Sequence, residues 1–121
     1  MALHNILGEQ GEEQAARYLK GIGYTILQQN YDSRIGQIDI IAKDRDTYVF
    51  VEVKTRESSG YGTPEEQFAR SRSQQRRIVG SALMWLKRRG GHPAARFDLI
   101  VIDQGELRHH KNAFTDERRL Y

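Results

Sequence analysis

The sequence is 121 residues long, which suits one domain, residues 1–121, with a single hydrophobic core. Its 38% hydrophobic and 29% charged content is that of a folded water-soluble chain and excludes a disordered one. No apolar run approaches the roughly 20 residues that span a bilayer, and the first residues lack a signal-peptide pattern. The absence of cysteine excludes disulfides and thiolate metal sites, and is what we expect of a cytoplasmic protein.

The formal net charge is only +3, but the basic residues are unevenly distributed. Acidic side chains concentrate in residues 9–66, whereas residues 70–89 are strongly basic. The basic side chains of this segment are Arg70, Arg72, Arg76, Arg77, Lys87, Arg88 and Arg89. Such a segment suits a phosphate backbone, although on charge alone a solvated helix face explains it equally well.

The predicted elements follow the order α-β-β-β-α-β, taken from the periodicity of apolar residues and from turn signals. A helix is expected over residues 9–21, with Glu12, Ala15, Ala16 and Leu19 on its inward stripe. Strands are expected at 24–29, 37–42 and 48–55, then a loop at 57–67, a helix at 71–89, a strand at 95–103 and a short edge strand at 107–109. We therefore predict an α/β domain with a mixed β-sheet flanked by helices.

Three charged residues interrupt the two best-defined strands. Glu52 and Lys54 share one face of their strand because side chains alternate along a strand. If the hairpin closes through residues 44–47, Lys43 opposes Tyr48, and counting outward places Asp39 opposite Glu52. A loop of odd length would put the two carboxylates on opposite faces, so this prediction depends on the register.

Facing carboxylates are costly, because two charges ~4 Å apart repel by roughly 4 kcal/mol at an effective dielectric constant near 20. A divalent cation would turn this repulsion into attraction, and carboxylate oxygens suit Mg²⁺ or Mn²⁺. Glu12 lies on the inward stripe of the first helix and could reach the same place. An E-x-K pattern alone is usually structural, so the prediction of a site depends on the addition of Asp39 and Glu12.

The Asp39, Glu52 and Lys54 pattern resembles the PD-(D/E)xK nuclease superfamily. The whole chain resembles the bacterial YraN family, and is also similar to archaeal Holliday-junction resolvases. The matching segments are GEEQAARYL (11–19), GYTILQQNY (23–31), GQIDIIAKD (36–44), VFVEVKTR (49–56), YGTP (61–64), QQRRIVGSALMWL (74–86), RFDLIVI (96–102) and HHKNAF (109–114). The resemblance implies a restriction-endonuclease-like core.

By that resemblance, Glu12, Asp39, Glu52 and Lys54 form the catalytic site. Asp39 and Glu52 would hold Mg²⁺ or Mn²⁺ together with the Val53 carbonyl, and Glu12 would complete the shell directly or through water. Lys54 would orient or deprotonate the attacking water, or stabilise charge on the phosphate. The implied reaction is hydrolysis of a phosphodiester bond in DNA.

The chain departs from the family pattern at two positions. The family usually has glutamate at the position of Gln37, so a negative charge near the site is missing and weaker metal binding is expected. It usually has lysine at the position of Gln74, which would weaken a phosphate contact that Arg72, Arg76 and Arg77 could supply instead.

Several alternatives remain open from the sequence. Arg56 is a nucleic-acid contact or simply the exposed end of a strand. The chain is a metal-dependent nuclease, acting on branched or damaged DNA by analogy with resolvases, or a non-catalytic nucleic-acid-binding module, or a protein-interaction domain. The same analogy makes a homodimer one option for the assembly. Asp98 is expected to pair with an arginine rather than to act in catalysis.

Overall fold

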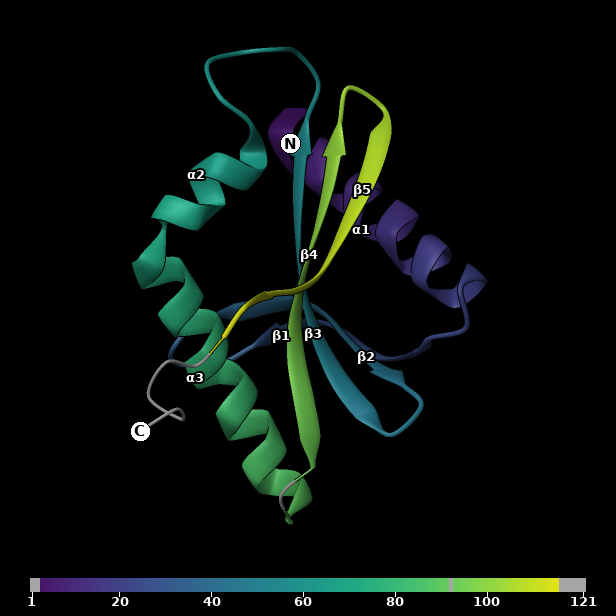
Figure 1. The fold of residues 1–121 in the computed structure, drawn as a ribbon, viewed down its shortest axis with the longest axis vertical. Helices are drawn as coiled ribbons and strands as arrows, with labels where there is room; N and C mark the ends of the chain where they lie inside the picture. The colour runs from purple at the N-terminus through teal and green to yellow at the C-terminus, as the bar shows by residue number, and fades with distance from the viewer. Residues whose placement is uncertain (1–2, 92, 116–121) are drawn as a thin grey trace.

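The computed structural model describes residues 3–91 and 93–115. It contains three helices and five strands in the order α-β-β-β-α-α-β-β. Their bounds are α1 Leu3–Gly21, β1 Thr25–Asp32, β2 Gln37–Asp44, β3 Thr47–Arg56, α2 Pro64–Arg70, α3 Arg72–Arg89, β4 Ala94–Asp103 and β5 Glu106–Phe114 (Figure 1). This confirms the predicted α/β class and is consistent with a nuclease-like core. Among the helices of the described residues, none has the length and apolarity needed to cross a membrane.

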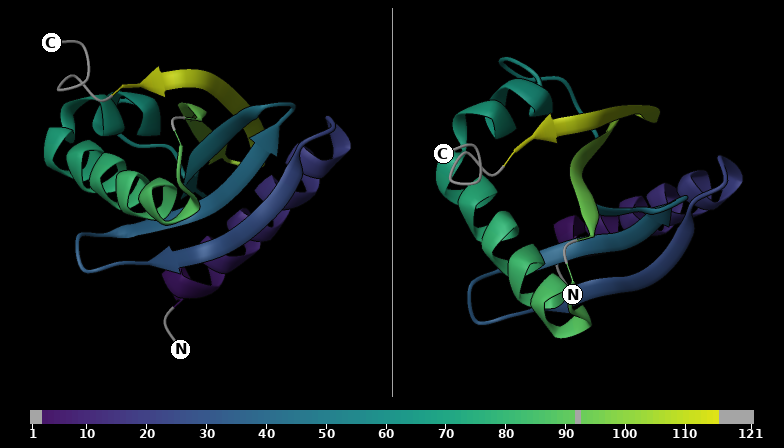
Figure 2. Two further views of the ribbon diagram at one scale, coloured as in Figure 1. Left: turned by 90° about the horizontal axis from the view of Figure 1, so that it is seen from below. Right: turned by 60° about the horizontal axis from the view of Figure 1, so that its bottom comes forward.

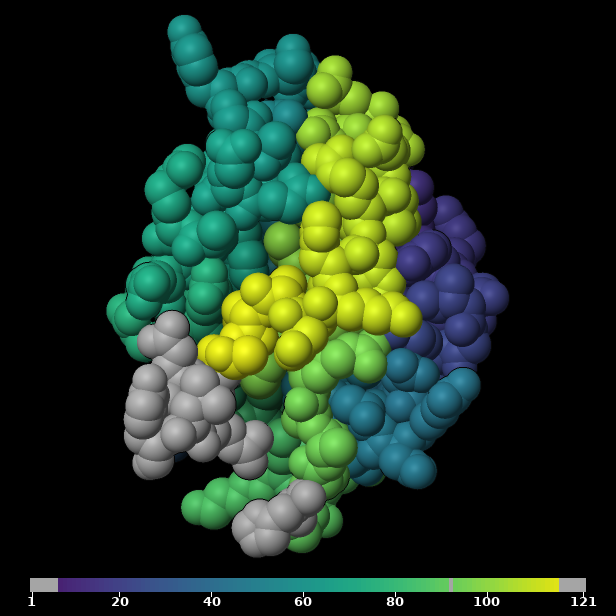
Figure 3. All heavy atoms as spheres, in the orientation of Figure 1, coloured from purple at the N-terminus to yellow at the C-terminus, as the bar shows by residue number. Residues whose placement is uncertain are grey.

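The five strands form one mixed sheet in the order β1-β2-β3-β4-β5. β3 and β4 are parallel and are joined by a crossover through α2 and α3, whereas the other neighbouring pairs are antiparallel. Helix α1 covers one face of the sheet and α3 covers the other (Figure 2). In the space-filling view, β5 lies across the front between the α2–α3 segment and α1 (Figure 3).

Each face of the sheet carries its own hydrophobic cluster. The inward stripe of α1 packs against β2, β3 and β4, with Ala15 and Leu19 fully buried, as predicted. On the other face, Trp85 and Leu86 of α3 pack with Phe50 and Phe97 of the sheet. The sheet is thus buried on both sides, so polar side chains within its strands require partners for their hydrogen bonds or charges.

The β2–β3 hairpin has the predicted register, with Lys43 opposite Tyr48. The ladder continues to Asp44 opposite Thr47, so the turn itself is shorter than the expected 44–47 loop. Arg45 takes up this tight turn with a φ of 56°, a conformation that few residues other than glycine, asparagine and aspartate adopt. The even register keeps Asp39 and Glu52 at corresponding positions.

The expected loop at 57–67 was wrong for its last residues, because α2 begins at Pro64. The Thr63 hydroxyl accepts a hydrogen bond from the Glu66 amide, and Pro64 occupies the first turn, which are strong helix-start signals. The decisive contact is long-range: Phe68 is buried with its ring 5.0 Å from that of Phe114. A short helix of this kind is stabilised by tertiary packing rather than by its own sequence.

Three other elements differ from their predicted bounds by more than two residues, and one of them is β1, which ends at Asp32 rather than at residue 29. Helix α1 begins at Leu3 rather than at residue 9, and β5 runs from Glu106 to Phe114 rather than over 107–109. The long β5 is a consequence of its pairing with β4, which extends from Asp103 opposite Glu106 to Phe97 opposite Phe114 with a register shift between. The length of an edge strand depends on pairing with its neighbour, so its own sequence predicts its ends poorly.

Gly11 marks the closest approach of α1 to the sheet. A Cβ added at Gly11 would overlap the Thr55 methyl group, whereas one added at Gly8, one turn earlier, meets nothing within 4 Å. We therefore expect Gly11→Ala to lower the free energy of unfolding by about 1–3 kcal/mol through overpacking. Gly8→Ala, the matched control, should be neutral or stabilising by up to about 1 kcal/mol because alanine favours helix. Urea unfolding of the two variants measures this, and equal stabilities would contradict it.

Candidate functional site

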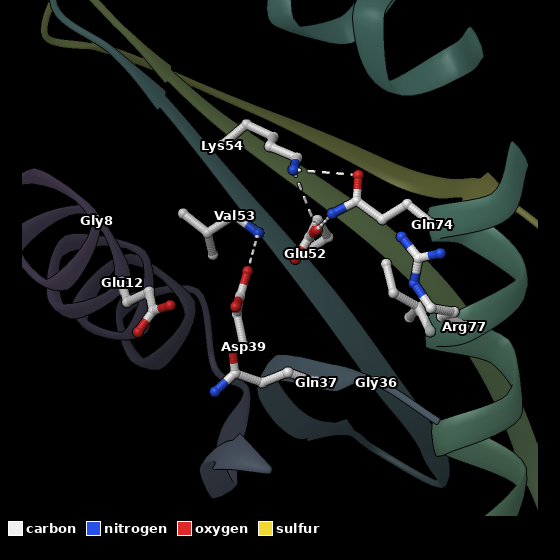
Figure 4. A pocket seen from close by; sticks show the side chains of 11 residues that line it. Gly8, Glu12, Gly36, Gln37, Asp39, Glu52, Val53, Lys54, Gln74 and Arg77 are labelled. Carbon is white, nitrogen blue, oxygen red and sulfur yellow. Dashed lines mark hydrogen bonds and ion pairs between the residues drawn. The ribbon is translucent and has the colours of Figure 1, made fainter. Parts of the chain in front are cut away.

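An open cavity of about 280 Å³ lies between α1, the β2–β3 hairpin and α3. All four residues predicted as catalytic line it: Glu12, Asp39, Glu52 and Lys54. The remaining lining residues are Gly8, Gly36, Gln37, Val53, Gln74, Arg77 and Ile78. We call this the acidic cavity. Figure 4 shows Glu12 entering it from α1, Asp39, Glu52 and Lys54 from the hairpin, and Gln74 and Arg77 from α3.

Asp39 lies where the β2–β3 ladder ends. The last paired residues on this side are Ile40 and Val51, one position before Asp39 and Glu52. Beyond them, the Val53 amide donates a hydrogen bond to Asp39 Oδ2 at 2.8 Å (Figure 4). The Asp39 side chain thus accepts the hydrogen bond that a β2 carbonyl would accept if the ladder continued. This contact holds the Asp39 carboxylate between Glu12 and Glu52 (Figure 4).

Glu52 is buried, with 6% of its surface exposed. Its Oε2 accepts a hydrogen bond from Gln74 Nε2 at 2.6 Å and lies 3.4 Å from Lys54 Nζ. Burial, followed by the hydrogen bond and charge of Asp39, raises the pKa of Glu52 to about 9, and Lys54 offsets only part of this. In the absence of a cation, Glu52 therefore holds a proton at neutral pH, despite the nearby lysine.

Glu12 is half-buried on α1 and faces Asp39 (Figure 4). Burial, followed by the charge and hydrogen bond of Asp39, raises the pKa of Glu12 to about 7, and a hydrogen bond with Asn30 offsets part of the rise. Three carboxyl groups thus share one cavity in which full ionisation is unfavourable. Strongly raised carboxyl pKa values in a cleft are typical of functional sites.

The donor chemistry of the acidic cavity fits a hard divalent cation, because three carboxyl groups line it. The side chains, however, are not positioned around one common point as metal ligands would be. Within the described ranges, no three His, Cys, Asp or Glu side chains are close enough together to bind a metal ion as they lie. Asp39 is engaged with the Val53 amide and Glu52 with Gln74. Cation binding would require these carboxylates to turn toward one another.

Gln74 has a place that the sequence reasoning missed. The sequence presents Gln74 only as a departure from a phosphate-binding lysine, whereas in the structure its amide bridges Glu52 and Lys54. Nε2 donates to Glu52, and Oε1 accepts from Lys54 Nζ at 3.3 Å. The available signal was helical spacing, since Gln74 lies four residues before the buried Ile78 and so on the inward face of α3.

The predicted nucleic-acid-binding residues occupy different positions. Arg77 lines the acidic cavity, and Arg72 and Arg76 are exposed on α3. Arg56 instead forms a two-point ion pair with Asp103, with distances of 2.9 and 2.8 Å, and donates to the Gly62 carbonyl. Gln37 is exposed at the mouth of the acidic cavity.

Comparison with known proteins places the chain in a family. Residues 11–102 match the family model described as "Uncharacterised protein family UPF0102". The chain is 47% identical over 118 residues to a UPF0102 protein of Geobacter sulfurreducens, covering 92% of this chain and 91% of the relative. It is 44% identical to one from Persephonella marina, covering 90% and 93%, and 45% identical to one from Rhodococcus opacus, covering 92% and 98%. These matches confirm the YraN resemblance, and the chain belongs to the UPF0102 family.

Proposed function

We propose that the chain is a metal-dependent nuclease that hydrolyses phosphodiester bonds in DNA. The observation that carries this proposal is the convergence of Glu12, Asp39, Glu52 and Lys54 on one open cavity. In two of the three carboxyl groups, burial and the neighbouring Asp39 raise the pKa, to about 7 in Glu12 and about 9 in Glu52. A cluster that is costly without a cation and open to solvent is difficult to explain by stability alone.

The residues divide the chemistry of hydrolysis among them. Asp39, Glu52 and the Val53 carbonyl would hold Mg²⁺ or Mn²⁺, with Glu12 binding directly or through water. The cation would supply a lowered pKa for a bound water and neutralise negative charge on the phosphate. Lys54 lies 3.4 Å from Glu52 with a third of its side chain exposed, so its ammonium can orient the attacking water or contact a phosphate oxygen. The water oxygen bonds to phosphorus as the ester P–O bond breaks, without a covalent enzyme intermediate.

DNA is the proposed substrate because basic side chains flank the acidic cavity. Arg77 lines it, and Arg72 and Arg76 follow the exposed side of α3 from the same end. Such groups bind phosphates without reading sequence, and their contribution falls as salt rises. A branched or damaged DNA is proposed by analogy with resolvases, and this analogy comes from the fold.

A second candidate is a nucleic-acid-binding module that keeps the fold without efficient catalysis. Gln37 favours it, because this exposed residue at the cavity mouth offers an amide where the family usually has a carboxylate. An amide oxygen is neutral and binds Mg²⁺ more weakly than a carboxylate does. The two candidates differ in whether bound DNA is cut.

The test is a cleavage assay on linear duplex, single-stranded and branched DNA in Mg²⁺ or Mn²⁺. We expect Glu52→Ala and Lys54→Ala each to lower the rate by about 10²-fold or more, as for other groups that stabilise a transition state. Lys43→Ala is the matched control, because Lys43 contacts Tyr48 and does not line the cavity. Its activity should equal that of the parent.

The other outcomes separate the candidates. Metal-dependent cleavage that survives both substitutions would place the activity elsewhere or in a contaminant. DNA binding without cleavage, weakening as salt rises, would favour the binding module. Neither binding nor cleavage would leave a protein-interaction domain. Circular dichroism of each variant confirms that it is folded.

A further inference from the structure

A second cavity, of about 320 Å³, lies between α2, the start of α3 and the end of β3. We call it the neutral cavity. Its walls include Lys54, Arg56, Gln67, Phe68, Ser71 and Gln74. Its volume falls within the range of small-molecule sites, about 300–1,000 Å³.

The neutral cavity adjoins the acidic cavity. Lys54 and Gln74 line both of them and are joined to each other by a hydrogen bond of 3.3 Å. A phosphate held by Lys54 at the acidic cavity would therefore have one of its neighbouring sugars at the opening of the neutral cavity.

The chemistry of the two cavities differs. Among the described residues that line the neutral cavity there is no carboxylate. Lys54 supplies positive charge, whereas the charge of Arg56 is paired with Asp103. Phe68 and Pro64 supply an apolar wall, and the Lys54 ammonium lies 5.9 Å from the centre of the Phe68 ring. Neutral hydrogen-bonding groups complete the lining.

Two of those neutral groups are placed to meet a ligand. Ser71 begins α3 without making the side-chain capping bond that serine usually makes there, so its hydroxyl is not consumed by the helix. Gln67 is exposed on α2 and offers both a donor and an acceptor. An apolar wall, polar groups at its edge and a cation beside it match a nucleoside that carries a phosphate.

We propose that the neutral cavity binds the nucleoside adjacent to the phosphate that is cut. This inference rests on the proposed nuclease function and narrows its substrate. A base inside a duplex is stacked and paired and cannot enter a side cavity without leaving the helix. The substrate class is therefore DNA with an unpaired nucleotide at the cleavage position, either single-stranded or locally opened.

The first experiment is an NMR titration of the full chain with thymidine 3′,5′-bisphosphate, with inorganic phosphate as the control. The bisphosphate should shift the backbone amide signals of Gln67, Phe68 and Ser71. Phosphate alone should shift signals near Lys54 without reaching Gln67. Identical shifts from the two probes, or bisphosphate shifts confined to other surfaces, would overturn the proposal.

The second experiment compares two tryptophan substitutions on α2. Gln67→Trp fills the neutral cavity, and Ala69→Trp places the same side chain at another exposed position that does not line it. We expect Gln67→Trp to weaken binding of a single-stranded oligonucleotide roughly tenfold, which is the scale of one base contact, and Ala69→Trp to leave it unchanged. Mn²⁺ affinity, measured by calorimetry, should be equal in both variants. Equal oligonucleotide affinities would contradict the proposal.

The two proposals fail in different ways. Metal-dependent cleavage that prefers duplex to single strands and is insensitive to Gln67→Trp would overturn the nucleoside site and leave the nuclease. Bisphosphate shifts at Gln67 and Ser71 without cleavage of any DNA would overturn the nuclease and leave a nucleotide-binding site.

Discussion

Addition of 10 mM Mg²⁺ is expected to raise the melting temperature of the chain by several degrees at pH 8 and by about 1 °C or less at pH 6. A cation at the acidic cavity must displace the protons that Glu12 and Glu52 hold, because their pKa values are raised to about 7 and about 9. Its apparent affinity therefore rises with pH, by about tenfold per pH unit for each proton displaced. With a dissociation constant of ~1 mM at pH 8, the added stability is about 1.4 kcal/mol.

The matched control for this experiment is Asp39→Asn. Asparagine keeps an oxygen that can accept the Val53 amide, so the local backbone contact survives while the central charge is lost. Its melting temperature should not respond to Mg²⁺ at either pH. Equal Mg²⁺ shifts in the parent chain and in Asp39→Asn would show that the cation binds elsewhere. Differential scanning fluorimetry across pH 6–8 provides the measurement.

The same pKa shifts determine how stability depends on pH without metal. Both folded-state pKa values lie above the ordinary value of 4.5, so the folded chain holds more protons than the unfolded chain between pH ~4.5 and ~9. Stability must therefore fall as pH rises through that window. We expect a loss on the order of 1–3 kcal/mol, since one pKa unit is worth about 1.4 kcal/mol and solvent in the open cavity screens part of the shift. Glu52→Gln should flatten this dependence in urea unfolding.

Asp98→Ala is expected to have the largest effect on stability, a loss of about 3–5 kcal/mol in the free energy of unfolding. Asp98 is fully buried. It accepts hydrogen bonds from Arg96 Nε at 3.0 Å, His109 Nε2 at 2.8 Å and the Asn112 amide at 2.9 Å. Burial alone would raise the pKa of Asp98, but these hydrogen bonds outweigh it and the net direction is down. Alanine would leave the buried His109 Nε2, the half-buried Arg96 Nε and the Asn112 amide without this acceptor.

Two further variants test the explanation for Asp98. Asp98→Asn keeps an oxygen acceptor but loses the charge opposite Arg96, so its cost should be intermediate. Asp32→Ala removes an exposed carboxylate at the end of β1 and should change stability by less than about 0.5 kcal/mol. An Asp98→Ala loss as small as that of Asp32→Ala would mean that the Arg96 and His109 contacts do not stabilise the fold. The contact of Arg96 Nε with Asp98 Oδ1 at 3.0 Å confirms the prediction that Asp98 pairs with an arginine.

The bounds of the strongly periodic helices and strands could be predicted from the sequence. Strands β2, β3 and β4 and helix α3 lie within one or two residues of the predicted bounds, because each has a strong period of apolar residues. Parity and turn length also placed Asp39, Glu52 and Lys54 on one side of a hairpin, and the inward stripe of α1 brought Glu12 to them. These predictions depend on spacing along a single element or between immediate neighbours.

Contacts between segments far apart in the sequence could not be predicted from periodicity. Arg56 faces Asp103 because β3 and β4 pair in parallel, in a register that no local pattern specifies. Gln74 bridges Glu52 and Lys54 because α3 crosses the end of β3, and Phe68 anchors α2 because β5 passes beside it. Periodicity specifies which face of an element is buried, whereas the partner on that face is selected by packing across the whole domain. The meeting of Glu12, Asp39, Glu52 and Lys54 in one cavity was therefore predictable. The contact of the Gln74 amide with two of them, and the neutral cavity beside them, follow from how α2 and α3 pack on the sheet.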